Sequence, residues 1–119
     1  MEMSGYMQGD THFFPVRVYY SDTDAGGVVY HAKYLDFAEH ARTEMLRCVG
    51  MEQQSQLSEG KTGFIVQSLS ITYHKPSYLD DLLMVETTIT KRAVFSLVME
   101  QIIKREGELI SSMQIRVGH

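Results

Sequence analysis

The chain has 119 residues, a hydrophobic fraction of 44% and a formal net charge of −4. This length suits one globular domain, and the acidic balance excludes a dominant electrostatic attraction to nucleic acid. One cysteine, Cys48, excludes an internal disulfide and fits a reducing compartment. No apolar run reaches the roughly 18 residues that span a bilayer. We therefore expect a soluble, cytoplasmic protein with no transmembrane segment.

The beginning of the chain is polar and lacks the hydrophobic region of a signal peptide. We expect residues 1–12 to form a disordered lead-in and residues 13–119 to form a single domain. The first strand is expected at Phe13–Tyr20, where apolar and polar residues alternate. A glycine-containing turn follows at residues 21–27.

From about His31 to Val49 the apolar residues recur with the period of an amphipathic helix. Gly50 follows at the position where a left-handed C-terminal cap is expected. The expected apolar face of this helix comprises Tyr34, Phe37, Ala38, Ala41, Met45 and Val49.

After a polar loop, the remaining sequence alternates in the manner of strands, with breaks at Pro76, Lys91-Arg92 and Glu106-Gly107. Short turns imply antiparallel neighbours, and a long amphipathic helix must bury its apolar face against the sheet. The pattern predicts an α+β domain in which a curved antiparallel five-stranded sheet wraps around one long helix. The four expected strands lie at about 65–74, 83–89, 94–103 and 109–117.

The link between the first strand and the helix carries the most chemical information. It contains Asp22 and Asp24, then the Gly26-Gly27 pair, and it reaches His31 near the first helical turn. The first backbone N–H groups of a helix have no internal partner and lie at the positive end of its dipole. They are therefore able to receive an oxyanion.

Three interpretations of the two aspartates were compared. A calcium loop starting at Asp22 is excluded because Gly26 and Lys33 would occupy the fifth and twelfth positions. A structural role is common for aspartate in turns. A catalytic role, as a base or nucleophile beside an oxyanion site, is the third interpretation. The residues alone leave the last two open.

The run of residues 16–31, VRVYYSDTDAGGVVYH, closely resembles the YbgC-type, Tol-Pal-associated acyl-CoA thioesterases. These belong to the 4-hydroxybenzoyl-CoA thioesterase group of the hot-dog fold. The likeness continues through residues 34–46 and is found again, more loosely, at Tyr73, Pro76 and residues 79–81.

This resemblance implies hydrolysis of an acyl-CoA to a free carboxylic acid and CoA, without a cofactor or metal. It implies that Asp24 and His31 are catalytic, with the backbone N–H of His31 at the thioester carbonyl, and that Gly27, Val28 and Tyr30 bind substrate. It also implies a homodimer or homotetramer with sites between subunits, and association with acyl carrier protein or the Tol-Pal system. The alternative is a non-catalytic acyl-thioester binding or scaffold protein.

Four charged residues outside this segment were also considered for substrate binding. Glu39 and Arg42 are candidates for the pocket, although an intrahelical or interface ion pair is the simpler expectation, since helical neighbours three apart commonly pair. Lys91 and Arg92, near a strand end, are candidates for the CoA phosphates, although exposed basic residues are usually only solvated. Cys48 is expected to be structural, because it lies at the helix end where the dipole disfavours a thiolate.

Overall fold

The computed structural model describes residues 3–50 and 65–118 and contains one α-helix, one short 3-10 helix and six strands in that part of the chain. In chain order these elements are β1 (Tyr6–Gln8), β2 (Thr11–Arg17), η1 (Tyr20–Asp22), α1 (Lys33–Cys48), β3 (Ile65–Tyr73), β4 (Leu82–Arg92), β5 (Ser96–Arg105) and β6 (Glu108–Gly118).

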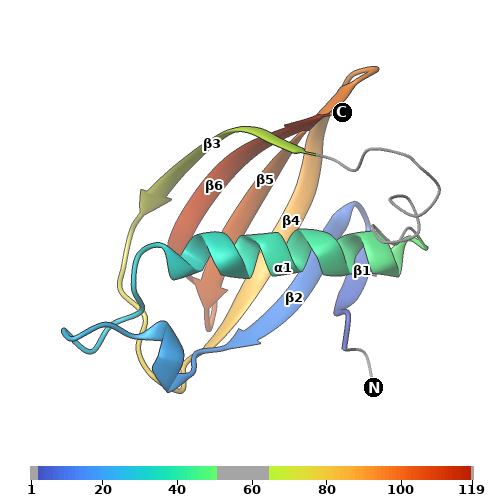
Figure 1. The fold of residues 1–119 in the computed structure, drawn as a ribbon. Coiled ribbons are helices and arrows are strands. Elements are labelled where there is room, and N and C mark those ends of the chain that lie inside the picture. The colour runs from blue at the N-terminus through green and yellow to red at the C-terminus, as the bar shows by residue number, and fades with distance from the viewer. Residues whose placement is uncertain (1–2, 51–64, 119) are drawn as a thin grey trace.

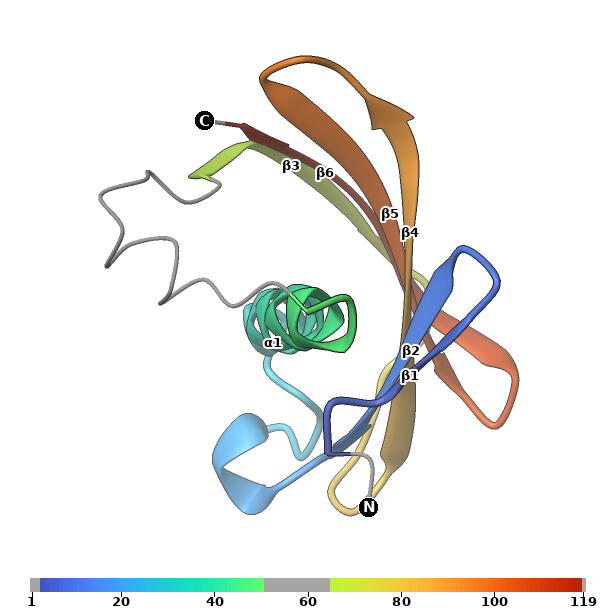
Figure 2. The same ribbon diagram turned by 90° about the vertical axis from the view of Figure 1, so that its right-hand side faces the viewer.

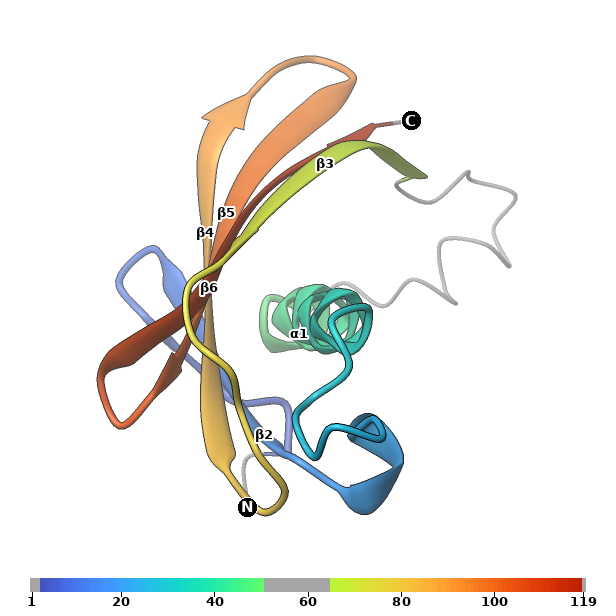
Figure 3. The same cartoon turned by 90° about the vertical axis from the view of Figure 1, so that its left-hand side faces the viewer.

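The six strands form one antiparallel sheet in the order β1-β2-β4-β5-β6-β3. Figure 1 shows α1 lying across this sheet, and Figures 2 and 3 show that the sheet curves around the helix. The expected α+β architecture, with one helix on the concave face of an antiparallel sheet, is therefore confirmed.

The apolar face of α1 forms the centre of the core together with inward-facing residues of the sheet. Tyr34, Phe37, Ala38, Ala41 and Met45 are buried as expected. The sheet contributes fully buried residues to the same cluster, including Leu83, Val85, Ile103, Ile110 and Ile115. The expectation for Val49 was wrong: it is 53% exposed, because α1 ends at Cys48 and the chain then turns at Gly50, whose φ is +82°.

The sheet has six strands rather than the five expected. The additional strand, β1, lies within the residues expected to be a disordered lead-in, and it pairs with β2 from Tyr6–Phe13 to Gln8–Thr11. The first long strand also ends earlier than expected, at Arg17, because the backbone N–H of Tyr19 turns to the carboxylate of Asp22 at 2.9 Å. The polar loop expected after α1 lies outside the described residues.

Among the described residues, the strand β3 forms one edge of the sheet and pairs with β6 alone. Nearly all of its residues are exposed, and four of them are large and apolar or aromatic: Ile65, Val66, Leu69 and Tyr73. A long apolar edge is a ready template for pairing with another strand. The helix, in contrast, lies toward the other side of the sheet, where it contacts β1, β2 and β4.

Candidate active site

The segment between η1 and α1 folds into a small hairpin that carries Asp24 at its tip. The backbone N–H of Tyr30 donates to the carbonyl of Asp22, and the N–H of Asp24 donates to the carbonyl of Val28, both at 2.9 Å. Thr23 and Val29 form the bridge between these pairs. The hairpin therefore presents Asp24 close to the turn and leads the chain directly toward the start of α1.

The carboxylate of Asp24 is exposed and is anchored through one oxygen. Its Oδ1 accepts the backbone N–H of Gly26 at 2.8 Å, whereas Oδ2 makes no hydrogen bond or ion pair within the described residues. A Cβ atom at position 26 would lie 3.2 Å from Oδ1, which explains why glycine suits that position. Asp24 lines a shallow surface hollow together with Tyr20, Thr23, Ala25, Gly27 and Leu79.

The neighbouring acid, Asp22, is held quite differently. Its side chain is only 14% exposed, its Oδ2 accepts the N–H of Tyr19 at 2.9 Å, and its Oδ1 lies 3.8 Å from the ammonium of Lys33. The Asp22 carboxylate thus links Tyr19, just before η1, to Lys33, the first residue of α1. Of the two acids, Asp24 is the one with an oxygen left to act on a ligand.

The loop between β3 and β4 supports the hairpin from the outside. The N–H of Val29 donates to the carbonyl of Ser77 at 2.8 Å, and Val28 forms a bridge with Tyr78. The hydroxyl of Ser77 accepts a hydrogen bond from the hydroxyl of Tyr34 at 3.0 Å. Burial raises the pKa of Tyr34, and the hydrogen bond to Ser77 opposes that rise. One buried serine therefore joins the hairpin to the helix.

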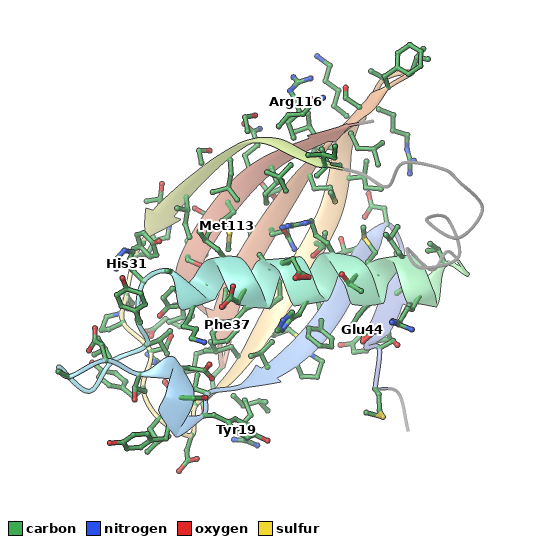
Figure 4. All side chains as sticks on the ribbon, in the orientation of Figure 1. Tyr19, His31, Phe37, Glu44, Met113 and Arg116 are labelled. Carbon is green, nitrogen blue, oxygen red and sulfur yellow. The ribbon has the colours of Figure 1, made fainter. Side chains whose placement is uncertain are left out.

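His31 lies two residues before the first residue of α1, beside the end of β3 (Figure 4). Its imidazole packs against the ring of Tyr30, with centroids 4.6 Å apart. Within the described residues, its backbone N–H has no acceptor, and no hydrogen bond or ion pair joins His31 to Asp24. The structure thus puts both residues on one segment without direct contact.

The other candidate residues lie elsewhere. Glu39 lines a cavity of about 240 Å³ between α1 and the sheet, with its carboxylate near the Thr43 hydroxyl at 3.3 Å. Arg42 donates to Gln101 on β5 at 2.9 Å. Burial lowers the pKa of Arg42 and the charge of Glu39 opposes that change, without a direct ion pair between the two side chains in the described residues. Lys91 and Arg92 are exposed at the end of β4. The turn that follows them lies at the opposite end of the sheet from η1 (Figures 1 and 2).

Cys48 lies 3.5 Å from Nε2 of His12, which invites comparison with a catalytic thiol and its base. However, Nε2 also lies 2.7 Å from the carbonyl of Ser4, which can only accept, so Nε2 carries the proton and cannot deprotonate the thiol. The other ring nitrogen is buried and has no partner among the described residues, and burial lowers the pKa of His12. The arrangement is that of a structural thiol at the end of α1.

No three His, Cys, Asp or Glu side chains converge in a way that could hold a metal ion in residues 3–50 and 65–118. In the same part of the chain, no helix has the length and apolarity needed to cross a membrane.

Comparison with known proteins agrees with this fold. Residues 26–111 match the family model described as the thioesterase superfamily. The chain is 49% identical over 105 residues to the acyl-CoA thioesterase YbgC of Haemophilus influenzae, covering 88% of this chain and 77% of that protein. It is 47% identical to the acyl-CoA thioester hydrolase YbgC of Escherichia coli O6:H1, covering 87% and 78%.

Among solved structures, a probable thioesterase from Bartonella henselae superposes with a TM-score of 0.88 at 36% identity, covering 91% of this chain and 90% of that one. The chain therefore belongs to the thioesterase superfamily, and its curved sheet around one helix is the hot-dog fold. The resemblance noted in the sequence is confirmed at the level of family and fold.

Two residues that shape this site were not assigned a role from the sequence. Both residues lie more than 40 positions further along the chain than their partners. Ser77 contacts Val29 and Tyr34, and Tyr73 contacts the carbonyl of His31. The alternation of β3 places Tyr73 on a face of the sheet but does not identify what it contacts. The loose likeness at Tyr73 was the only signal that pointed to this end of β3.

Proposed function

We propose that this chain hydrolyses the thioester bond of an acyl-CoA, releasing a carboxylic acid and CoA, with Asp24 as its catalytic carboxylate. The family and the printed names of the two YbgC relatives support the reaction class. The strongest structural support for the residue is the carboxylate of Asp24, which has one anchored oxygen and one unengaged oxygen on the segment that leads into α1.

The proposed mechanism uses two kinds of group. The backbone N–H of His31, near the positive end of α1, polarises the thioester carbonyl and stabilises the negative charge that develops on its oxygen. Asp24 either activates a water molecule for attack on the carbonyl carbon or attacks that carbon itself to form a mixed anhydride. In both routes the CoA thiolate leaves, and in the second a water molecule then hydrolyses the anhydride, which releases the carboxylic acid and restores the Asp24 carboxylate. The imidazole of His31 holds the water or assists proton transfer.

The remaining substrate contacts are proposed from the resemblance and from position. Gly27 and Val28 flank the hairpin turn, and Tyr30 covers one side of the His31 ring. Glu39 lines the cavity beside α1. Lys91 and Arg92 supply positive charge for the CoA phosphates; because they lie at the far end of the sheet from η1, this role requires a substrate bound across more than one subunit.

The test is thiol release from a panel of acyl-CoAs of different chain length, with the wild type and Asp24→Asn. We expect Asp24→Asn to fold and to lose about 10²–10⁴ in kcat, because amide oxygen is a poor base and nucleophile. Turnover by Asp24→Asn at the wild-type rate would show that the assignment is wrong. Binding of acyl-CoA by the wild type without turnover of any substrate would favour the scaffold alternative.

Two further variants serve as controls for this test. Asp36→Asn changes an exposed acid in the first turn of α1, and it should keep wild-type activity. Asp22→Asn should lose less activity than Asp24→Asn but more stability, because both oxygens of Asp22 hold the segment in place. An equal loss from all three substitutions would point to general electrostatics rather than to a specific carboxylate.

We also propose that the active unit is a homodimer or a tetramer built from it. The exposed apolar edge of β3 supports pairing with the β3 of a second copy across a two-fold axis. A second copy would also cover the side of the concave face that α1 leaves open, and it would help to exclude water from Asp24. Leu69→Lys should therefore lower the molecular mass measured by light scattering, whereas Gln114→Lys, at an exposed position on β6, should not.

Association with acyl carrier protein or with the Tol-Pal machinery, and a cytoplasmic location, stay predictions from the sequence. Turnover of acyl-CoA and of the matching acyl carrier protein thioester, measured side by side, distinguishes the two carriers. Equal rates would mean that the carrier contributes little to recognition, whereas a strong preference for one would identify the physiological substrate class.

A further inference from the structure

We propose that Tyr73 is a positioning residue for the reaction: its hydroxyl fixes the backbone of His31 so that the His31 N–H faces the thioester carbonyl. This inference rests on the proposed function. Tyr73 is the last residue of β3, and its hydroxyl donates to the carbonyl of His31 at 3.0 Å. This hydrogen bond joins the edge strand of the sheet to the segment that precedes α1, across 42 residues of sequence.

The peptide groups on either side of His31 are fixed by separate partners. The first of them joins the Tyr30 carbonyl to the His31 N–H, and its carbonyl accepts the N–H of Lys33 at 2.8 Å. Because a peptide group is planar, holding the Tyr30 carbonyl also sets the direction of the His31 N–H. The next peptide group, which carries the His31 carbonyl, is held by Tyr73. Without that hydroxyl, the backbone dihedrals of His31 have one restraint fewer.

The ring of Tyr73 acts on the side chain of His31 as well. It meets the imidazole edge-on, with centroids 6.2 Å apart and an interplanar angle of 88°. It also packs at 5.7 Å against the ring of Tyr34, which is buried and bonded to Ser77. The ring is thus supported by the core, so that removing only the hydroxyl leaves the packing in place.

The position of Tyr73 differs from that of an ordinary strand residue. It is 44% exposed, and its hydroxyl is aimed at a backbone carbonyl outside the sheet. A displaced N–H donor stabilises the transition state less while leaving most substrate contacts intact. The expected signature is therefore a loss of kcat with little change in KM.

The experiment compares Tyr73→Phe with the wild type in steady-state hydrolysis of an acyl-CoA from the panel. We expect kcat to fall about 10-fold to 100-fold, since small misplacements of catalytic groups have effects of that size, with KM within about twofold. The circular dichroism spectrum and the fraction of folded protein should match the wild type. The matched control is Tyr6→Phe on β1, an exposed tyrosine whose hydroxyl makes no hydrogen bond within the described residues, and it should retain the wild-type kcat.

The outcomes separate this inference from the function on which it rests. A wild type that turns over acyl-CoA, with an inactive Asp24→Asn and a fully active Tyr73→Phe, overturns the role of Tyr73 alone. A fall in kcat that only follows a fall in folded protein also overturns it, because Tyr73 would then act through stability. A wild type that hydrolyses no acyl-CoA overturns both proposals together.

Discussion

The segment ahead of α1 is held mainly by backbone hydrogen bonds, whereas the second half of the helix is held by a buried network of side chains. Ahead of the helix, Asp22, Val28 and Tyr30 form a hairpin. Within the described residues, one oxygen of the Asp24 carboxylate and the N–H of His31 have no hydrogen-bond partner. In the second half of the helix, Arg42 and the sheet are joined through Gln101. The first arrangement leaves polar groups available to a ligand, and the second leaves almost none.

The buried network is complete around the amide of Gln101, which is fully buried on β5. Its oxygen accepts from Arg42 at 2.9 Å, and its nitrogen donates to the carbonyl of Ala38 at 2.9 Å and to the hydroxyl of Thr87 at 3.0 Å. Burial lowers the pKa of Arg42, and the charge of nearby Glu39 opposes that change. Satisfied buried polar networks of this kind fix one arrangement of helix and sheet.

The largest effect on stability should come from breaking this network. Gln101→Ala removes three hydrogen bonds and leaves a small cavity, so we expect a loss of about 3 kcal/mol in the free energy of unfolding. Urea denaturation measures the loss, and Gln114→Ala on the exposed side of β6 should change the free energy by less than about 0.5 kcal/mol. If the second half of α1 stabilises the fold without acting in catalysis, Gln101→Ala has the same kcat per folded molecule as the wild type. A fall in kcat as large as that of Asp24→Asn would contradict the separation.

Much of the fold could be predicted from the sequence because α1 and the strands β3 to β6 have strong apolar periods. The strand β1 could not, because its three residues are all exposed and show no alternation. Its best signal was Gly9-Asp10, a short turn before the next strand, where Gly9 adopts a φ of +63°. The partner of Arg42 was also missed, since helical spacing suggests a neighbour three residues away and the real partner lies 59 residues further on.

A middle-sized effect should distinguish the glycines that flank the two ends of α1. Gly27 and Gly50 both have a φ of +82°, and a Cβ atom added to either would meet no atom of the described residues within 4 Å. Replacement of either glycine by alanine should therefore lower the free energy of unfolding by about 1 kcal/mol through backbone strain alone. Only Gly27→Ala should also lower kcat, because Gly27 closes the turn that presents Asp24, its N–H donating to the Asp24 carbonyl at 3.0 Å.

The two glycine variants are matched in strain, so their difference isolates the function of the segment. Thermal unfolding gives the stability of each, and thiol release gives kcat under identical conditions. Equal kcat values for Gly27→Ala and Gly50→Ala would mean that the hairpin geometry does not matter for catalysis. A larger loss of kcat from Gly50→Ala than from Gly27→Ala would contradict the proposal that the reaction takes place at the start of α1.

The candidate site could be predicted only in part. Asp24, Gly27 and His31 lie in one continuous run, so a sequence motif was enough to group them. The supports of that run come from β3 and the loop after it, through Tyr73 and Ser77. Contacts between such distant residues follow from the curvature of the sheet and the position of the helix, which no local pattern in the sequence encodes.

The smallest effect should be a pH dependence of stability that arises at the end of α1. His12 is buried beside Cys48, and burial lowers its pKa below its usual 6.5, with the charge of Glu44 and the bond to Ser4 opposing. As pH falls through about 6.5, His12 therefore binds a proton in the unfolded chain but not yet in the folded chain. The free energy of unfolding is highest above that pH and declines below it. The decline stops below the folded-state pKa, where both states are protonated.

Urea denaturation at pH 7.5 and at pH 5.5 measures this decline, with His12→Gln as the test and His40→Gln, at an exposed position on α1, as the control. Wild type and His40→Gln should lose more stability between the two pH values than His12→Gln does, since the other histidines are common to all three and cancel in the difference. The loss should appear in the free energy of unfolding and leave kcat per folded molecule unaffected. If His12→Gln showed the same pH dependence as the wild type, the titrating group would have to lie elsewhere, and the distinction between a stabilising end and a reactive end of α1 would lose its pH signature.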